Sequence, residues 1–461
     1  MTYYLAVDIG ASSGRHILCH IEEGKLILEE VYRFSNNVVL KDNHYCWDID
    51  YLFDSILQGI KECVKINKIP VSMGIDTWAV DYVLLDSNGH RLTDAYAYRD
   101  RRNDIGVQKV KEIISQKELY QRTGIQFQKF NTIYQLKSYK DNIFDKAVDY
   151  LMIPDYFNYL LTGKKVNEYT NMSTTELLDI QTNELDKELL KEMGIPENIF
   201  ERMVMPSTKI GYLTEDIKKI VGCNIEVVVP ATHDTGSAYM AAIEEDSIIL
   251  SSGTWSLLGI ETKEAFVSDE TRIANFTNEG GYDHRYRFLK NIMGLWIIQE
   301  VSRNLGNQYS FSKLVEEARN ASFDGIFDVN DDCFLKPDNM ILEIKKYFEE
   351  RNEEAPQSVG EIAYCVYHSL AYCYKKAIEE LEKMTNKKYA TINIIGGGCQ
   401  NELLNEMIAD VTGKRVVAGP IEATALGNVL SQLLVDGVII DLNQGREMIR
   451  QSFEIKEYKG E

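Results

Sequence analysis

Four aspartates lie in or beside apolar segments, where a carboxylate is costly unless it has a partner or a task. They are Asp8, Asp76, Asp81 and Asp234. An ionised carboxylate that is buried without a partner destabilises a fold by several kcal/mol. A carboxylate in such a place can bind a hydrated metal ion or turn N–H groups, accept a proton, or accept hydrogen bonds from hydroxyl groups.

The first of these aspartates opens the motif DIGASSGR at residues 8–15. Its small residues leave backbone N–H groups open to a phosphate, and Ser12, Ser13 and Arg15 can add donors. The alternative is that Asp8 only caps the turn of a hairpin. The chain contains neither GxxxxGK[ST] nor GxGxxG, which disfavours P-loop NTPases and dinucleotide-dependent oxidoreductases.

The second motif, GIDTWAVD at residues 74–81, puts two carboxylates and a tryptophan between two apolar segments. An indole face can stack on the C–H face of a sugar, while carboxylates accept hydrogen bonds from its hydroxyls. Ala79 is small enough to let the backbone approach a ligand. The alternative is a buried Trp78 beside aspartates that only form the turn.

The third motif is ATHDTGS at residues 231–237, which follows an apolar segment and precedes a helical pattern. A carboxylate at the carboxyl end of a strand, beside a helix N-terminus, is where α/β proteins place ligands and catalytic groups. Two alternatives stay open. Asp234 could cap the helix for Ser237 and its neighbours, and His233 could be a structural histidine.

Glycine and hydroxyl residues form a fourth candidate, Ser252-Gly253-Thr254 together with the later glycine triplet 396–398. Glycines between a strand and a helix let the main chain approach a phosphate or a planar group, with a helix N-terminus nearby. A tight structural connection is the alternative. Cys399 beside the triplet is expected to be a packing residue, because no nearby basic partner activates its thiol.

These motifs need strands and helices to hold them, and the hydrophobic patterns predict such elements. In the first half we expect strands at 3–9, 17–21, 71–75, 80–85 and 225–229 and helices at 51–65, 105–116 and 237–243. In the second half we expect strands at 248–250, 255–260, 392–395 and 415–417 and helices at 359–383, 401–411 and 422–434. The fold class is therefore α/β.

An apolar strand that runs into a Ser/Gly/Thr turn and out into a second apolar strand occurs once near the start of each half of the chain. We interpret this pattern as a weak internal repeat. At roughly 100 to 200 residues per domain, a chain of 461 residues suggests two or three domains. We expect two, with residues 1–245 as the first domain and 246–461 as the second.

Composition places the chain among globular proteins without a surface for nucleic acid or anionic membranes. Hydrophobic residues make up 44% and charged residues 26%, and 71 acidic against 50 basic residues give a formal net charge of −21. An anionic ligand must therefore be held locally, by backbone N–H groups or a metal. No segment resembles a signal peptide or a membrane span. The eight cysteines show no CxxC pair, which predicts reduced thiols in a cytoplasmic protein.

Together, in this order and spacing, the motifs resemble the FGGY carbohydrate kinases, whose fold is that of actin, hexokinase and the heat-shock ATPases. The resemblance runs essentially from end to end, through VDIGASSGR, GIDTWAVDYVLLD, AYRDRR, MIPDYFNYLLTG, EYTNMSTT, HDTGSA, LSSGTWSLLG, TNEGG, RFLKNIMGLW, IIGGGCQN and EATALGN. Where the general family has a K-x-W element, this chain has FNTIYQL at residues 130–136. The resemblance implies two actin-like, ribonuclease H-like domains with an interdomain cleft that closes on ATP and a sugar.

The resemblance also implies roles for individual residues. Asp234 would be the catalytic base that takes the proton from the O1 hydroxyl of the sugar, and Asp8 would be the carboxylate near Mg²⁺. The expected ATP contacts are Ala11, Ser12, Ser13, Gly14, Arg15, Thr254, Gln299 and Gly397. The expected sugar contacts are Ala79, His233, Asp234, Thr235 and Asn291.

The activity that the resemblance implies is an ATP-dependent ketose kinase that works with Mg²⁺ and ATP. L-Rhamnulose, phosphorylated at O1, is the expected sugar, and L-fuculose or D-xylulose stay open as alternatives. An actin-like or chaperone-like ATPase that moves a partner is the alternative from a different class, but it gives no reason for Trp78 and His233-Asp234-Thr235. We expect no nucleic acid or membrane partner, and a monomer or a homodimer.

Overall fold

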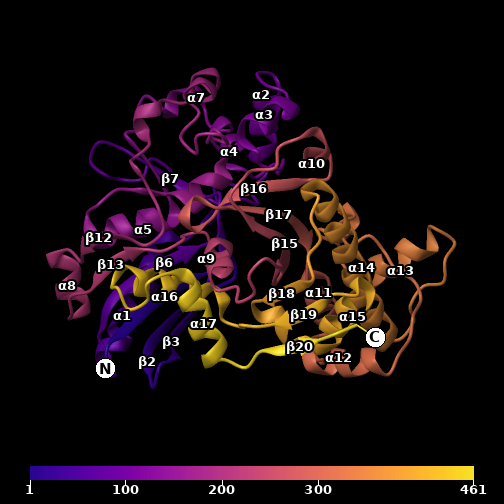
Figure 1. The fold of residues 1–461 in the computed structure, drawn as a ribbon. Helices are drawn as coiled ribbons and strands as arrows, with labels where there is room; N and C mark the ends of the chain where they lie inside the picture. The colour runs from indigo at the N-terminus through magenta and orange to yellow at the C-terminus, as the bar shows by residue number, and fades with distance from the viewer. Residues whose placement is uncertain (461) are drawn as a thin grey trace. The chain divides into compact units, whose positions relative to one another are not determined.

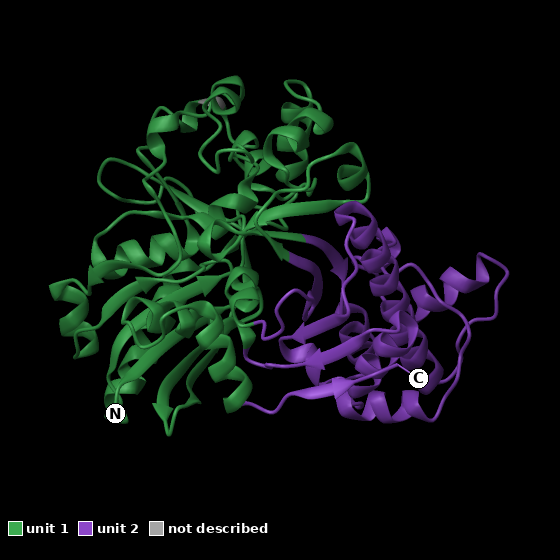
Figure 2. Cartoon of the chain, in the orientation of Figure 1, with its two compact units in different colours: residues 1–241, 261–288, 423–452 green, residues 242–260, 289–422, 453–461 purple. Residues whose placement is uncertain are grey.

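The structure is a computed structural model that describes residues 1–460 (Figure 1). The chain forms two compact units, each assembled from segments that lie far apart in the sequence (Figure 2). Unit 1 comprises Met1–Ala241, Glu261–Phe288 and Ala423–Ser452. Unit 2 comprises Ala242–Ile260, Leu289–Glu422 and the residues from Phe453 on. The chain therefore returns to unit 1 twice after it first leaves it.

The core of unit 1 is a six-stranded sheet whose central strands are apolar and buried. In spatial order its strands are β12 (Thr208–Tyr212), β13 (Glu226–Val229), β6 (Pro70–Thr77), β1 (Tyr3–Ile9), β2 (Ser13–Glu22) and β3 (Lys25–Ser35). β1 pairs antiparallel with β2 and parallel with β6, and β6 pairs parallel with β13. The parallel strands β1, β6 and β13 therefore end at one edge of the sheet.

Helices from opposite ends of the chain pack against this sheet. α1 (Ile49–Lys65) buries its apolar face in the same core as β1 and β6. α16 (Ala423–Val435) contacts β1, β6 and α9 (Asp234–Met240), so yellow and indigo segments lie side by side in Figure 1. α16 and α9 approach closely because Gly427 has no side chain: a Cβ there would lie 1.8 Å from the carbonyl oxygen of Ser237.

Smaller sheets and further helices complete unit 1. The small sheets are β4 (Val38–Lys41), β5 (His44–Trp47) and β8 (Ala95–Tyr96); β7 (Tyr82–Leu85) and β9 (Asp149–Met152); and β10 (Asn167–Glu168) and β11 (Met203–Val204). The helices are α2 (Asn103–Lys111), α3 (Gln116–Thr123), α4 (Thr132–Lys137), α5 (Ile153–Thr162), α6 (Tyr169–Met172), α7 (Lys187–Met193), α8 (Glu215–Val221), α10 (Asp269–Ile273) and α17 (Leu442–Ser452).

A second sheet, of seven strands, repeats the topology of the first. Its order is β16 (Phe276–Gly280), β17 (Tyr286–Met293), β15 (Trp255–Thr262), β14 (Ile248–Ser252), β18 (Thr391–Ile395), β19 (Arg415–Ala418) and β20 (Lys456–Tyr458). β14 pairs antiparallel with β15 and parallel with β18, and β18 pairs parallel with β19, as β1 does with β2 and β6 and as β6 does with β13. The predicted internal repeat is confirmed, and so is the α/β fold class. The domain boundary near residue 245 stays a prediction.

The helices of unit 2 are α11 (Trp296–Asn304), α12 (Phe311–Arg319), α13 (Met340–Glu349), α14 (Val359–Thr385) and α15 (Glu402–Thr412). α14 begins with a capping box in which Ser358 and Glu361 each bond the backbone amide of the other. Within residues 1–460 no helix is both long and apolar enough to span a membrane. All eight cysteines are free thiols.

Three predicted elements differ from the structure. The strand expected at 80–85 begins only at Tyr82, because Val80 has a φ of 67° and turns the chain. The helix expected at 105–116 is two helices, since the Ser115 side chain caps a new one by accepting from the Glu118 amide. The helix expected at 237–243 is α9, which begins three residues earlier, at Asp234.

Candidate active site

Three of the four singled-out aspartates meet at the edge of the first sheet where its parallel strands end. Asp8 on β1 and Asp76 on β6 are direct partners in the parallel register. Asp234 is the first residue of α9, and the amide of Thr77 at the end of β6 donates to the Thr232 carbonyl at 2.8 Å, which ties this segment to the strand. The predicted place of Asp234, after a strand and beside a helix N-terminus, is therefore observed in unit 1, and the structure brings Asp8 and Asp76 to the same edge.

The negative charge of this cluster is only partly offset. Asp8 Oδ2 accepts from Arg15 Nη2, directly opposite on β2, at 2.7 Å. Asp76 is fully buried, and its Oδ2 accepts from Asn428 Nδ2 on α16 at 2.6 Å, while its Oδ1 has no hydrogen-bond partner among the described residues. Burial, and after it the Asp8 carboxylate, raises the pKa of Asp76 well above its usual value. The site therefore favours a proton or a cation.

Asp234 has the surroundings of a general base. Desolvation, and after it the Asp8 carboxylate, raises the pKa of Asp234 to about 7, although 31% of its side chain stays exposed. Its Oδ1 accepts from the backbone amide of Thr235 at 2.6 Å and from the Thr235 hydroxyl at 3.2 Å. Among the described residues no hydrogen bond reaches Oδ2, which leaves that oxygen for a substrate proton. The amide of Ser237 donates to the His233 carbonyl, so the alternative that Asp234 caps the helix there is wrong.

His233 lies beside Asp234 and is almost completely buried. Its Nε2 is 3.4 Å from Asp234 Oδ1, and its Nδ1 is 3.0 Å from Nη2 of Arg287 on β17. Burial, and after it the Arg287 charge, lowers the pKa of His233 well below its usual value, which makes the imidazole neutral at neutral pH. Neither Arg287 nor its partner Glu279 was a predicted site residue, although both belong to strings that carry the family resemblance, RFLKNIMGLW and TNEGG.

The turn between β1 and β2 and the first residues of β2 carry the predicted phosphate contacts 11–15. Asn36, which sequence reasoning missed, pins this turn: its Nδ2 donates to the Gly10 carbonyl and its amide donates to the Ser12 carbonyl. Ala11 and Ser12 are exposed at the tip. Gly14 is required for packing, because a Cβ there would lie 2.1 Å from the Phe34 ring. The Gly10 and Ser12 carbonyls thus accept hydrogen bonds from Asn36, while the tip of the turn faces solvent.

The predicted sugar contact Ala79 belongs to a strained turn that several side chains hold. Val80 has a φ of 67°, a conformation that costs a β-branched residue on the order of 1–3 kcal/mol. The Thr132 hydroxyl and Gln135 Nε2, both from the FNTIYQL segment, donate to the Val80 carbonyl at 2.7 and 3.2 Å. This segment therefore fixes the backbone beside Ala79, a role that the sequence did not reveal.

Asp81 anchors the same turn from its other side. Its carboxylate accepts from the indole nitrogens of Trp47 and Trp78 at 2.6 and 2.9 Å and from Gln135 Nε2 at 2.8 Å. Desolvation raises the pKa of Asp81 to about 6 despite these donors. Trp78 is 6% exposed, so it is a buried tryptophan and not an open stacking surface, and of the two aspartates only Asp81 supports the turn, since Asp76 lies on β6.

In unit 2 the two glycine and hydroxyl motifs come together. Gly398 packs on Ser252 so closely that a Cβ would lie 2.0 Å from the Ser252 hydroxyl, whereas a Cβ on Gly397 would meet nothing within 4 Å. The Thr254 hydroxyl donates to Gln299 Oε1 at 3.3 Å, so two predicted ATP contacts are neighbours. Asn291 lies half-buried on β17 in unit 2.

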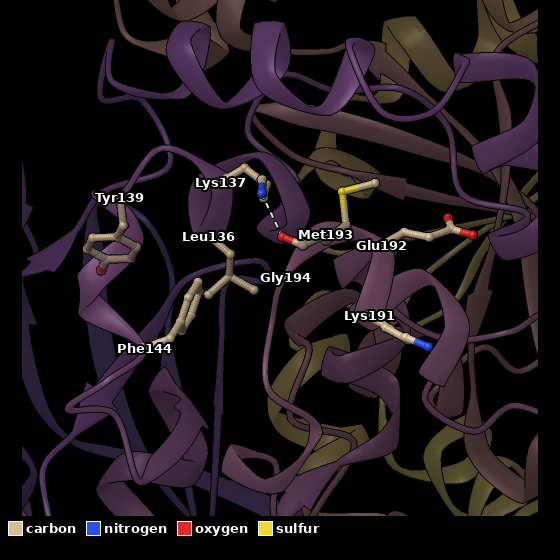
Figure 3. Close-up of a pocket in the computed structure, with 8 residues that line it drawn as sticks. All are labelled: Leu136, Lys137, Tyr139, Phe144, Lys191, Glu192, Met193 and Gly194. Atoms are coloured by element: carbon tan, nitrogen blue, oxygen red, sulfur yellow. Dashed lines mark hydrogen bonds between the residues drawn. The ribbon is translucent and has the colours of Figure 1, made fainter.

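A separate hollow of about 370 Å³ lies in unit 1. Figure 3 shows its lining, in which Lys137 Nζ donates to the Met193 carbonyl at 2.6 Å beside the Phe144 and Tyr139 rings. No predicted site residue lines it, so it is distinct from the carboxylate cluster.

The carboxylate cluster suits a partly hydrated Mg²⁺. No group of three or more His, Cys, Asp or Glu side chains within residues 1–460 is arranged to hold a metal by itself. Mg²⁺, however, usually keeps several waters and takes one or two carboxylates together with substrate phosphates. Asp8 and the unpartnered Asp76 Oδ1 are hard oxygen donors of that kind. The donor set therefore fits the ion that accompanies ATP.

Comparison with known proteins extends these local features to the whole chain. The sequence model of the FGGY family of carbohydrate kinases, N-terminal domain, matches residues 3–241, and that of the C-terminal domain matches residues 248–434. A protein named rhamnulokinase from Oceanobacillus iheyensis is 51% identical over 98% of this chain and 97% of its own length. Another from Bacillus subtilis is 45% identical over 98% and 94%.

Solved structures agree on the fold. A ligand-bound xylulose kinase from Lactobacillus acidophilus has a TM-score of 0.82 at 18% identity, covering 100% of this chain and 94% of that one. A glycerol kinase from Plasmodium falciparum with ADP has a TM-score of 0.78 at 16% identity and the same coverage. The two-domain fold of the actin-like sugar kinases, expected from the sequence, is confirmed.

Proposed function

The chain belongs to the FGGY family of carbohydrate kinases, enzymes that use ATP, and from that premise we propose that it phosphorylates L-rhamnulose at O1. The observation that carries the chemistry is Asp234, a carboxylate with a pKa of about 7 whose Oδ2 carries no hydrogen bond in the described structure. The name rhamnulokinase, borne by relatives 51% and 45% identical over nearly the full length, supports the choice of sugar.

In the proposed reaction Asp234 Oδ2 accepts the proton of the O1 hydroxyl as that oxygen attacks the γ-phosphorus of ATP. Phosphoryl transfer asks the protein for positioning and for neutralisation of charge more than for covalent chemistry. A base that titrates near neutral pH is largely ionised at working pH and still takes a proton readily. Thr235 holds Oδ1 and so keeps Oδ2 in one orientation.

We propose that Asp8 holds the Mg²⁺ of Mg·ATP through coordinated water, with Asp76 behind it. The bound ion would supply positive charge against the phosphates. Arg15 already pairs with Asp8 and keeps that carboxylate in place. Asn428 does the same for Asp76.

The remaining contacts come from both parts of the chain. We propose that residues 1–245 supply the base, most sugar contacts and the first phosphate-contacting turn, and that residues 246–461 are the nucleotide-binding domain. The proposed ATP contacts are Ala11, Ser12, Ser13, Gly14, Arg15, Thr254, Gln299 and Gly397. The proposed sugar contacts besides Asp234 are Ala79, His233, Thr235 and Asn291.

A coupled assay of ADP release across a panel of sugars tests this function, with phosphorus NMR to identify the product. We expect the highest kcat/KM for L-rhamnulose, lower values for L-fuculose and D-xylulose, and a poor value for glycerol, which leaves His233 and Thr235 unpaired. A higher kcat/KM for another ketose would identify that ketose as the substrate, and the proposal that the protein is a sugar kinase would still hold. ADP release that does not depend on sugar would support the ATPase alternative instead.

A further inference from the structure

Arg287 has no exposed surface, which is unusual for an arginine and requires that its charge be matched nearby. Its Nε donates to the Gly280 carbonyl at 2.9 Å. Its Nη1 lies 3.1 Å from Oε2 of the buried Glu279, and its Nη2 lies 3.0 Å from His233 Nδ1. All four residues belong to unit 1, so this contact set lies within one compact body.

The contact with Arg287 decides where the imidazole proton of His233 sits. A guanidinium carries only donors and keeps its proton at every pH at which the enzyme works. Nδ1 of His233 must therefore accept, and in a neutral imidazole the proton is then on Nε2. That Nε2–H points towards Asp234, whose Oδ1 is 3.4 Å away.

Glu279 offers a competing arrangement that the geometry disfavours. Its Oε2 lies 3.5 Å from His233 Nδ1 and could accept a proton from that nitrogen. A proton on Nδ1 would, however, face the donor Arg287 Nη2 at 3.0 Å, and two donors at that distance repel. Glu279 is better matched by Arg287 Nη1, which is closer.

We propose that Arg287, braced by Glu279, is a positioning residue that fixes His233 as an Nε2–H donor beside Asp234. This inference rests on the proposed function, in which His233 contacts the sugar. The single lone pair of the ring is then occupied, so His233 does not compete with Asp234 for the O1 proton. The sugar must also present an oxygen lone pair to Nε2–H, which discriminates against an ammonium group at that position.

Nitrogen-15 NMR of the full-length protein labelled at histidine tests the tautomer without any substitution at Arg287. His233→Gln identifies the His233 signals among the seven histidines. At neutral pH we expect an unprotonated Nδ1 and a protonated Nε2. A protonated Nδ1, or an imidazolium, overturns the proposal. The spectrum requires no turnover, so its outcome is independent of whether L-rhamnulose is the substrate.

A charge-balanced pair of substitutions tests the consequence for activity. Arg287→Met combined with Glu279→Gln removes both charges and frees the Nδ1 lone pair. We expect a mixture of His233 tautomers and a roughly 3- to 10-fold loss of kcat/KM for the sugar, as for one lost hydrogen bond, with KM for ATP unchanged. Glu279→Gln alone keeps Arg287 and should keep the Nε2–H signal.

Rescue separates positioning from packing. Arg287→Lys retains a charged donor, and we expect it to restore the Nε2–H signal and part of the sugar affinity relative to the double variant. If the double variant retains the wild-type spectrum, Arg287 does not set the tautomer. Should the double variant fail to fold, the wild-type spectrum and the Arg287→Lys spectrum still decide the question.

Discussion

The hairpins β1–β2 and β14–β15 occupy equivalent places in two sheets of the same topology, yet they carry opposite chemistry. The first brings a partly buried charge pair, Asp8 with Arg15, next to two further carboxylates. The turn of the second, Ser252-Gly253-Thr254, has no charged residue and packs against the glycine triplet. The two hairpins thus share a backbone arrangement but differ in their side chains. The carboxylates Asp8, Asp76 and Asp234 form what we call the charged site, whereas the second turn and the glycine triplet form the uncharged neutral cradle.

The two turns are also held in different ways. In unit 1 a single residue, Asn36, holds the turn with its side-chain amide on the Gly10 carbonyl and its backbone amide on the Ser12 carbonyl. In unit 2, among the described residues, only backbone amides are seen to do so: Leu295 donates to the Gly253 carbonyl at 2.9 Å, and Trp296 donates to the Thr254 carbonyl at 3.1 Å. Where the main chain of another segment bonds directly to a turn, little room is left for side chains, which explains the glycines around this second turn.

Asp234→Asn should have the largest effect of any single change at the charged site. The amide keeps the shape but cannot take the proton, so we expect kcat to fall by roughly 10²–10⁴ with ATP binding within a few-fold. Steady-state kinetics and calorimetry with ATP measure both. Asp216→Asn, at a side chain that is 89% exposed, is the matched control. Near-normal turnover in Asp234→Asn would show that Asp234 is not the base.

The fold of Asp234→Asn can be checked through its pH dependence. The folded-state pKa of about 7 lies above the ordinary value of 3.8, so this carboxyl contributes stability at low pH that is lost as pH rises through 7. Asparagine has no such loss. We therefore expect the melting temperature of the variant, relative to wild type, to rise between pH 5 and 8, and a fall would argue for structural damage instead.

The glycine triplet offers a matched pair in the neutral cradle. Gly398→Ala places a Cβ 2.0 Å from the Ser252 hydroxyl and should lower both the melting temperature and ATP affinity. Gly397→Ala meets nothing within 4 Å, so it should fold normally. If ATP lies against this residue, Gly397→Ala should raise KM for ATP roughly tenfold with an unchanged melting temperature. An unchanged KM would remove Gly397 from the nucleotide site.

The pH profile of activity should respond to a substitution in the β1–β2 hairpin but not to one at the turn of the β14–β15 hairpin. With both substrates below KM, we expect activity to rise over about one pH unit on either side of 7 as Asp234 ionises. Asp8→Asn removes a negative charge that helps raise this pKa, so its acidic limb should move to lower pH while its Mg²⁺ requirement rises. Thr254→Ala is the control, since it should leave the acidic limb of the profile at the wild-type pH. If the acidic limb of Asp8→Asn stays at the wild-type pH, the Asp8 and Asp234 carboxylates do not interact.

Thr254→Ala should have the smallest effect. It removes one exposed hydroxyl, whose bond to Gln299 is long at 3.3 Å, so we expect KM for ATP to rise about two- to threefold with kcat maintained. Thr254→Ser keeps the hydroxyl and should stay at the wild-type value. A loss as large as that of Gly398→Ala would mean that the cradle depends on this side chain more than on its backbone.

The sequence predicted most of the elements and the place of the carboxylates, because strands and strand ends leave strong local patterns. The structure places Asp234 beyond a strand end and beside a helix N-terminus, as the α/β pattern implied, and shows in addition that Asp8 and Asp76 lie at the same sheet edge. It also confirms the pairing of the two glycine and hydroxyl motifs. Their roles towards ATP, Mg²⁺ and sugar stay predictions.

The sequence did not predict the side chains that support these groups. Asn428 reaches Asp76 from 352 positions along the chain, and Arg287 reaches His233 from 54. Such partners are set by how α16 and β17 pack, which no local pattern records. Val80 was missed for a related reason, because a β-branched residue in a left-handed conformation contradicts its own propensity.

The return of α16 to unit 1 constrains the order in which a growing polypeptide can mature. Ribosomes release the N-terminal segment first, at about 5–20 residues per second. Until residue 428 emerges, Asp76 lacks its amide partner and the space around Gly74 stays unfilled. The carboxylate cluster is therefore assembled only when translation is almost complete, and a nascent or prematurely terminated chain carries all three aspartates without the finished cluster.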